Sequence, residues 1–169
     1  MTRCYDAAME IRYRPVGTIH SPFAEPAGAP IQPVAANTAE GSVEVLPELE
    51  AALQDLAGFS HIILLYHFDR ACSFAPLVTP FLDRAPHGVF ATRVPSRPNA
   101  IGLSVVELLE VRGTTLRVRG IDVLDGTPLL DVKPYVAEFD ARSPSRSGWL
   151  EHNAARAGVM RDDGRFWRK

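Results

Sequence analysis

A rigid polar loop is the first candidate for ligand chemistry in this sequence. Residues 88–104 read GVFATRVPSRPNAIGLS and hold Arg93, Arg97 and Asn99 close to two prolines. Proline fixes φ and biases the residue before it toward extended backbone, so the loop holds its side chains with little conformational freedom. Two arginines suit a carboxylate or phosphate, because a guanidinium group can bond either one bidentately. Pairing with acidic side chains of the same chain explains the arginines equally well.

A second polar segment, residues 120–136, reads GIDVLDGTPLLDVKPYV. Asp122 stands among strand-like apolar residues, where a carboxylate needs a hydrogen-bonding partner such as an amine or hydroxyl of a ligand. Asp125 precedes a glycine, a pair typical of a hairpin turn, so a turn alone can account for it. Lys133 follows Asp131 by two residues on one strand face, which favours an ion pair over a catalytic role.

The third segment, residues 60–71, reads SHIILLYHFDRA. His61 and His67 share one face of a strand, but no third ligand accompanies them, so no metal site is predicted and His61 is interpreted as a packed, hydrogen-bonded histidine. Asp69 and Arg70 follow the apolar run, at a strand end where ligand contacts are common.

Several familiar catalytic motifs are missing from the sequence. It contains no GxGxxG after a strand, no Walker loop, no GxSxG elbow and no HExxH pair. The sequence therefore lacks the motifs that usually identify dinucleotide oxidoreductases, nucleotide hydrolases, serine hydrolases and zincins. The residues alone indicate a ligand-binding β-domain of unspecified chemistry.

Composition indicates one globular domain. Of the 169 residues, 46% are hydrophobic and 22% are charged, which is enough to build a real core. No apolar run approaches a membrane span and the N-terminus lacks the apolar core of a signal peptide, so a cytoplasmic location is expected. Cys4 and Cys72 are interpreted as free thiols, because neither has metal-ligand spacing and the cytoplasm is reducing.

Charge is distributed unevenly along the chain. Residues 142–169 carry seven basic and three acidic side chains, a net charge of +4, whereas the other 141 residues carry a net charge of −6. Such a basic tail could contact phosphate, although a solvated terminus is the simpler interpretation. Trp149 and Trp167 argue for docking of the tail, since large aromatic side chains are seldom left fully exposed.

The elements that must position these residues are mostly strands. Residues 46–58 predict the clearest helix, with Leu46, Leu49, Leu53 and Leu56 on one face. Residues 62–65 predict a strand buried on both faces. A long loop is expected over residues 24–38, and strands at 14–23, 41–46, 88–93, 101–113, 114–124 and 129–136. Consecutive strands without room for crossover helices favour an antiparallel or barrel-like sheet.

Four blocks of sequence resemble a known family. VGTIHSPF, LAGFSHIILLYHF, GVFATRVPSRPNAIGLS and IDVLDGTPLLDVKPYV resemble, in order and spacing, the signature blocks of the TsaA/TrmO (YaeB-like) family over residues 15–140. The expected organisation is an N-terminal extension at 1–14, a family domain at 15–141 and a basic C-terminal tail at 142–169. The fold that the resemblance implies is mainly β, a single-sheet β-barrel with one or two short helices.

The resemblance also implies a ligand and a reaction. Members bind S-adenosylmethionine in loops at one barrel end, commonly as homodimers, and characterised members methylate the exocyclic amine of threonylcarbamoyl-adenosine beside the tRNA anticodon. The expected methyl-donor contacts are Gln32, Pro33, Asp69, Arg70, Arg93, Leu103, Gly120, Ile121 and Asp122. The candidates for catalysis are Asn99, Asp125 and Lys133, and those for substrate binding are Arg97 and Asn99. Neither a metal nor a membrane is expected as a partner.

Three departures from the family pattern bear on the substrate. Pro30-Ile31-Gln32 stands where TrmO-type members commonly read Pro-Arg-Gln, Asp69 replaces a familiar histidine, and the extra C-terminal domain of longer members is not seen. These changes are compatible with methyl-donor binding but weigh against a tRNA substrate. The family blocks and the basic tail still make a tRNA methyltransferase the leading hypothesis. Methylation of a small molecule or protein, and non-enzymatic binding of S-adenosylmethionine, remain as alternatives.

Overall fold

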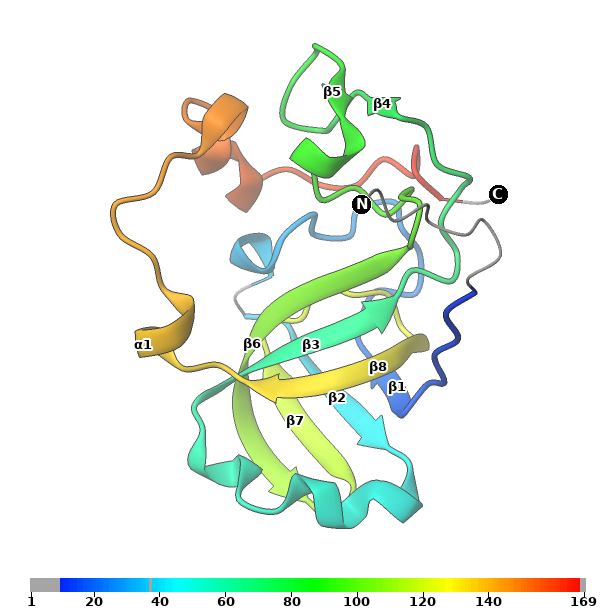
Figure 1. The fold of residues 1–169 in the computed structure, drawn as a ribbon, viewed down its shortest axis with the longest axis vertical. Helices are drawn as coiled ribbons and strands as arrows, with labels where there is room; N and C mark the ends of the chain where they lie inside the picture. Colours follow the sequence, from blue (N-terminus) through cyan, green and yellow to red (C-terminus); the bar gives the residue numbers. More distant parts are fainter. Residues whose placement is uncertain (1–9, 37, 168–169) are drawn as a thin grey trace, which may run out of the picture.

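Six antiparallel strands close into one barrel, which forms the lower part of the molecule in Figure 1. The computed structural model describes residues 10–36 and 38–167. Around the barrel the strand order is β1-β2-β7-β6-β3-β8. The strands are β1 (Gly17–His20), β2 (Glu40–Val45), β3 (His61–His67), β6 (Ile101–Arg112), β7 (Thr115–Arg119) and β8 (Thr127–Pro134). The prediction of a mainly β fold built on a single barrel-like sheet is confirmed.

Alternate residues of each barrel strand fill the closed interior. On β3, Ile62 and Leu64 are fully buried, whereas the alternate residues Ile63 and Leu65 are half-buried on the outer face. Because side chains alternate across a strand, a strand of a closed barrel turns only one of its faces to the core. The expectation of burial on both faces is therefore wrong for the outer face of β3.

The helix predicted at residues 46–58 is replaced by two 3₁₀ helices, η2 (Pro47–Leu53) and η3 (Leu56–Gly58). Asp55 has a left-handed backbone, with φ of 65°, which interrupts any continuous helix. Leu53 is buried, and Leu49 and Leu56 pack against the core, so the apolar spacing serves to close the lower end of the barrel in Figure 1.

The strand predicted at residues 88–93 is also wrong. A small separate sheet pairs β4 (Leu77–Val78) with β5 (His87–Gly88), and the chain then turns into the 3₁₀ helix η4 (Val89–Ala91). The Thr92 hydroxyl donates to the carbonyl of Val89 at 2.8 Å, which stabilises the turn. A side-chain bond of this local kind offers the backbone an alternative to strand pairing.

The C-terminal segment folds back over the upper end of the barrel (Figure 1). It contains α1 (Ala137–Asp140), η5 (Gly148–Leu150) and η6 (Ala154–Gly158). Trp149 donates from Nε1 to the carbonyl of Ala91 at 2.8 Å and stacks on the His87 ring at 4.4 Å between centroids. The Trp167 ring packs edge-on against the Phe68 ring, just after β3, at 5.9 Å between centroids. Docking of the tail is thus confirmed as far as Trp167, and residues 168–169 lie outside the described residues.

Two further sequence predictions concern thiols and membranes. Cys72 is a free cysteine, as predicted, and Cys4 lies outside the described residues. None of the helices in the described part of the chain is long and apolar enough to cross a membrane.

The pairing of β1 with β2 leaves no room for a side chain at Gly17. A Cβ there would lie 2.2 Å from the Glu44 carbonyl oxygen, a backbone atom that cannot move aside without disturbing the sheet. We expect Gly17→Ala to lower the free energy of unfolding by about 1–3 kcal/mol. Gly58→Ala is the control, because its Cβ would meet nothing within 4 Å. Urea unfolding measures both, and equal midpoints for the two variants would contradict the close approach.

Candidate functional site

A pocket of about 810 Å³ lies at the barrel end covered by the C-terminal segment. This volume is in the range of sites for small ligands and cofactors. Its walls come from the loop before β2, from β3 and β6 and the loop between them, from the loop after β7, and from the C-terminal segment. The lining residues are 29–33, 66, 68, 80–82, 90–95, 97, 101–103, 122–124, 127, 149, 150, 154, 157, 162 and 167.

A chain of three hydroxyl and carboxyl groups runs from the barrel interior to the pocket. The Ser104 hydroxyl donates to Asp122 Oδ1 at 2.6 Å, and the Tyr66 hydroxyl lies 3.0 Å from Ser104 Oγ. Since Ser104 has one hydroxyl hydrogen and gives it to Asp122, Tyr66 is the donor in the second bond. Tyr66 and Ser104 are buried, so Asp122 is held from inside the barrel while facing the pocket.

Burial raises the pKa of the Asp122 carboxyl to about 6, because removal from water disfavours its charged form. The hydrogen bond from Ser104 and the positive charge of Arg93 act in the opposite direction and lower that pKa. Burial likewise raises the pKa of Tyr66, which keeps its hydroxyl protonated as a donor. Asp122 is therefore a carboxyl group that changes charge close to neutral pH.

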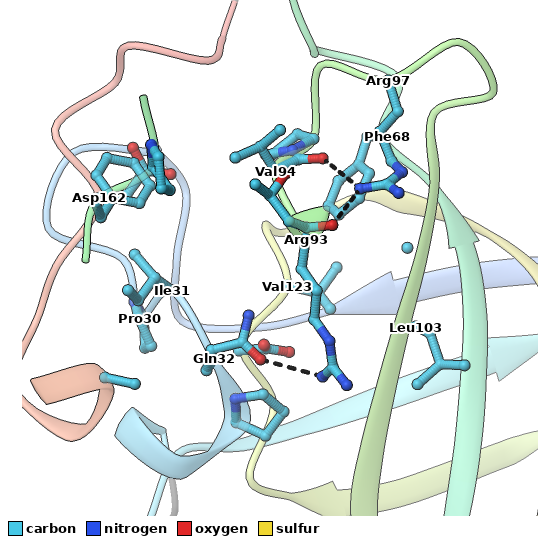
Figure 2. Close-up of a pocket in the computed structure, with 18 of the residues that line it drawn as sticks. Pro30, Ile31, Gln32, Phe68, Arg93, Val94, Arg97, Leu103, Val123 and Asp162 are labelled. Atoms are coloured by element: carbon cyan, nitrogen blue, oxygen red, sulfur yellow. Dashed lines mark hydrogen bonds between the residues drawn. The ribbon is translucent and has the colours of Figure 1, made fainter. Parts of the chain in front are cut away.

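Arg93 and Gln32 meet at the rim of the pocket. The Arg93 guanidinium donates to Gln32 Oε1 at 3.3 Å, and Figure 2 shows its side chain reaching toward Gln32. Arg93 is exposed and has no ion pair within the described part of the chain. Its guanidinium is thus free to bind an anionic group of a ligand in the pocket.

Arg97 has a different place in the same loop. Its guanidinium donates to the carbonyl oxygens of Thr92 at 3.0 Å and Val94 at 3.3 Å, as the dashed lines in Figure 2 show. These bonds stabilise the turn that carries Arg93. Arg97 lines the pocket, but its polar atoms are used to shape the loop.

The structure brings six of the predicted site residues together and leaves seven apart. The pocket is lined by Gln32, Pro33, Arg93, Arg97, Leu103 and Asp122. The residues that do not line it are Asp69, Arg70, Asn99, Gly120, Ile121, Asp125 and Lys133.

The loop after β7 explains why Asp122 reaches the pocket while its neighbours do not. The strand predicted at 114–124 ends at Arg119, and Gly120 follows with φ of +85°. This turn sends Ile121 into the barrel core, where it is fully buried. Asp122 then faces the pocket, so it does not lie within a strand as the sequence suggested.

Asp125 and Arg70 contact each other away from the pocket. Arg70 donates to the Asp125 carbonyl at 2.5 Å and to the Ala24 carbonyl at 3.0 Å. The Asp125 carboxylate accepts a bond from the Ser21 backbone N–H at 3.1 Å and lies 3.3 Å from the His20 ring. These contacts stabilise the turn before β8, which is the structural role that the sequence left open for Asp125.

The remaining predicted residues are on the surface. Lys133 pairs with Asp131 at 2.6 Å, the ion pair that their spacing favours. Asn99 is exposed on the loop before β6, next to but outside the lining residues, and Asp69 is exposed after β3. His61 is exposed on the surface, yet its ring meets the Tyr135 ring edge-on at 6.2 Å between centroids and lies 3.0 Å from the Ser60 hydroxyl, so both parts of the expectation are present without burial. Among the described residues no group of three or more potential ligands could hold a metal ion.

Sequence reasoning missed Tyr66, Ser104 and the C-terminal wall of the pocket. The available signal was Gly102, a glycine inside a strand, which often marks a close approach of another group. A Cβ on Gly102 would lie 2.1 Å from the Tyr66 ring, because β3 pairs Tyr66 directly with Gly102. Tyr66 can be identified as the partner of Gly102 only from the β3–β6 register, which cannot be derived from the sequence.

Comparison with known proteins connects this site to a family. The family model described as the tRNA-methyltransferase O N-terminal domain matches residues 18–141. A probable S-adenosyl-L-methionine-binding protein of Pyrococcus abyssi is 58% identical over 157 residues, which cover 93% of this chain and 85% of the relative.

Two further relatives are longer than this chain. The human tRNA (adenine(37)-N6)-methyltransferase is 37% identical over 149 residues, covering 82% of this chain and 34% of the human protein. The crystal structure of TrmO from Pseudomonas aeruginosa superposes with a TM-score of 0.71 at 42% identity, over 83% of this chain and 62% of that chain. The segment after residue 141, which supplies one wall of the pocket, lies outside the family model.

The raised pKa of Asp122 predicts a pH-dependent stability. In the unfolded chain the carboxyl ionises near pH 4, whereas in the folded protein it stays protonated until about pH 6, so wild-type stability falls as pH rises through this window. We expect the stability of Asp122→Asn not to fall in this way, because an asparagine side chain does not ionise. Its unfolding free energy relative to wild type should increase between pH of about 4 and 7, by at most about 3 kcal/mol.

Urea unfolding across this pH range measures the effect. Ser104→Ala is the companion variant: it keeps the carboxyl but removes a bond to its charged form, so its stability loss should extend to higher pH. A difference between Asp122→Asn and wild type that does not change with pH would contradict the assignment.

Proposed function

The chain belongs to the TrmO family, and we propose that it is an S-adenosylmethionine-dependent methyltransferase acting on the exocyclic amine of threonylcarbamoyl-adenosine in tRNA, beside the anticodon. The observation that carries the proposal is the pocket itself, in which Arg93 and Asp122 face one hollow at a barrel end. The family resemblance also predicts a homodimer, and the cytoplasmic location expected from the sequence stays a prediction.

Arg93 and Asp122 together suit the amino-acid end of the methyl donor. That end carries a carboxylate and an ammonium side by side, and a zwitterion needs a cation and an anion in the same arrangement. The charge of Arg93 acts on Asp122, which places the two groups within electrostatic reach of each other. In this proposal Arg93 binds the carboxylate and Asp122 accepts hydrogen bonds from the ammonium.

The other walls of the pocket suit the nucleoside part of the donor. Leu103, Phe68 and Trp149 offer apolar surface for a base, and Gln32 offers amide groups for hydrogen bonds to polar atoms. Ile31, which stands where TrmO-type members commonly read arginine, also lines the pocket. This change leaves donor binding intact and removes one cation from the site.

When bound, S-adenosylmethionine supplies a methyl group on a sulfonium, which is already an activated leaving group. The protein then has to hold the acceptor nitrogen in line with the carbon–sulfur bond. Transfer would replace the proton of the acceptor nitrogen by the methyl group, with the carbon–sulfur electron pair left on sulfur and the proton released to water. Asn99, at the rim, remains the candidate for holding the acceptor, and Asp125 and Lys133 would need a different arrangement of the chain to take part.

Binding of the donor without catalysis is the second candidate function. Among the described residues, the carboxyl groups that line the pocket are those of Asp122 and Asp162. Asp162 already accepts bonds from Trp167 and Gly164, so it is not placed as a base. The Pyrococcus abyssi relative, too, is named only as a probable binding protein.

Isothermal titration with S-adenosylmethionine is the first test, followed by transfer of a labelled methyl group to tRNA from a strain lacking this gene. Wild-type protein should bind, and Arg93→Ala and Asp122→Asn should each lose about tenfold to a hundredfold in affinity, as expected for charge-assisted hydrogen bonds. Affinity should also fall as pH drops through about 6, where Asp122 becomes protonated, and this dependence should vanish in Asp122→Asn. Binding without methyl transfer would favour the second candidate, and no binding would refute both.

The C-terminal wall of the pocket can be tested on one 3₁₀ helix. Ala154 lines the pocket and its neighbour Ala155 does not, although both are exposed on η6. We expect Ala154→Phe to fill donor space and to weaken S-adenosylmethionine binding at least about tenfold, about 1.4 kcal/mol. Ala155→Phe should bind like wild type in the same titration. Equal affinities would show that the tail does not bound the donor site.

A further inference from the structure

A second hollow lies beside the pocket and is lined by arginines. This groove of about 670 Å³ is formed by residues 79–84, Asn153, Arg156 and Arg165, and is called the arginine groove below. Residues 80–82 line both hollows, so only that stretch of chain separates them. A ligand longer than one nucleoside could therefore occupy the two sites together.

The 3₁₀ helix η6 and the residue before it, Asn153, contribute to both hollows. Ala154 and Ala157 line the pocket, whereas Asn153 and Arg156 line the arginine groove. With three residues per turn, residues three apart fall on one side of such a helix, so the two pairs point in different directions. The small side chains face the pocket and the polar ones face the groove.

Arg165 is held in position, while the other two arginines are available. Arg165 pairs with Asp163, and its guanidinium lies 4.9 Å from the centre of the Phe81 ring. Arg84 and Arg156 are exposed, and neither has an ion pair with any of the described residues.

The one acid of the groove is already engaged. Asp83 lies 3.0 Å from His87 Nε2 and accepts bonds from its own loop at the backbone N–H groups of Arg84 and Ala85. These bonds lower the pKa of Asp83, the His87 contact most of all. Its charge is therefore satisfied locally, and the arginines remain as the groups that an incoming ligand meets.

We propose that the arginine groove binds backbone phosphates of the RNA whose modified base enters the neighbouring pocket, an inference that rests on the proposed function. Guanidinium groups bind phosphate oxygens bidentately, and two unpaired arginines can each take one phosphate. The rest of the chain is acidic, since the net charge outside residues 142–169 is −6. A polyanion is repelled from that body, and this groove is where it docks.

Fluorescence anisotropy with a labelled RNA anticodon stem-loop tests the proposal over salt concentrations of about 50 to 200 mM. The Arg84→Ala/Arg156→Ala double variant should bind at least about tenfold more weakly at low salt. Its plot of log affinity against log salt should be less steep by about 1.5, the contribution of two phosphate contacts. Arg112→Ala/Arg117→Ala is the matched control, because it removes the same charge from β6 and β7 and should leave the slope unchanged.

The outcomes separate this inference from the proposed function. Both double variants should bind S-adenosylmethionine like wild type in a titration without RNA. If the groove variant and the control bind RNA with equal affinity and slope, or if wild-type protein does not bind RNA, the groove assignment is overturned. If instead S-adenosylmethionine does not bind while the groove variant still weakens RNA binding, the proposed reaction fails and the groove assignment stands.

Discussion

The contact of the Tyr66 ring with the backbone of Gly102 joins the barrel core to the floor of the pocket. Only glycine fits at that position, because a Cβ would lie 2.1 Å from the ring. The close approach lets the Tyr66 hydroxyl reach Ser104, and Ser104 in turn reaches Asp122. Tyr66, Ser104 and Asp122 thus form a chain of polar groups that ends at the pocket, and each is hydrogen-bonded, as buried polar groups generally are.

The pocket is built jointly by the barrel and by a segment outside the family model. Loops at one end of the barrel supply Arg93, Gln32 and Asp122, but on their own they leave one side open. Residues 148–167 close that side, and they are held there by the Trp149 hydrogen bond to Ala91, by the Ser96 hydroxyl bond to the Phe166 carbonyl, and by burial of Phe166. Burying a phenylalanine contributes about 1.5–3 kcal/mol toward holding the segment in place. The same segment carries two of the three arginines of the groove.

Sequence patterns predicted the strands better than the connections. The long run at 101–113 forms β6 almost as expected, because alternation over a dozen residues is a strong signal. The strand predicted at residues 88–93 is wrong, because the apolar residues there form a 3₁₀ turn that is stabilised by the Thr92 hydroxyl. The leucines of 46–58 do pack toward the core, yet the left-handed backbone at Asp55 breaks the helix that their spacing suggests. In both cases the conformation depends on a local contact or a backbone dihedral angle, which the spacing of apolar residues does not predict.

Among the residues of the site, too, some could be predicted from the sequence and others could not. Arg93 and Asp122 could be predicted from their blocks, while Tyr66 and Ser104 could not, because their pairing depends on the register of β3 against β6. Asp122 also has to satisfy two opposed demands. Burial that raises its pKa lowers the stability of the folded protein above pH of about 4, and the same burial makes its charge effective toward a ligand in a medium of low dielectric. An apolar residue at this position would make the fold more stable than a buried carboxyl group does. The retention of Asp122, with hydrogen-bonded groups beneath it, therefore argues that the carboxyl group faces a ligand.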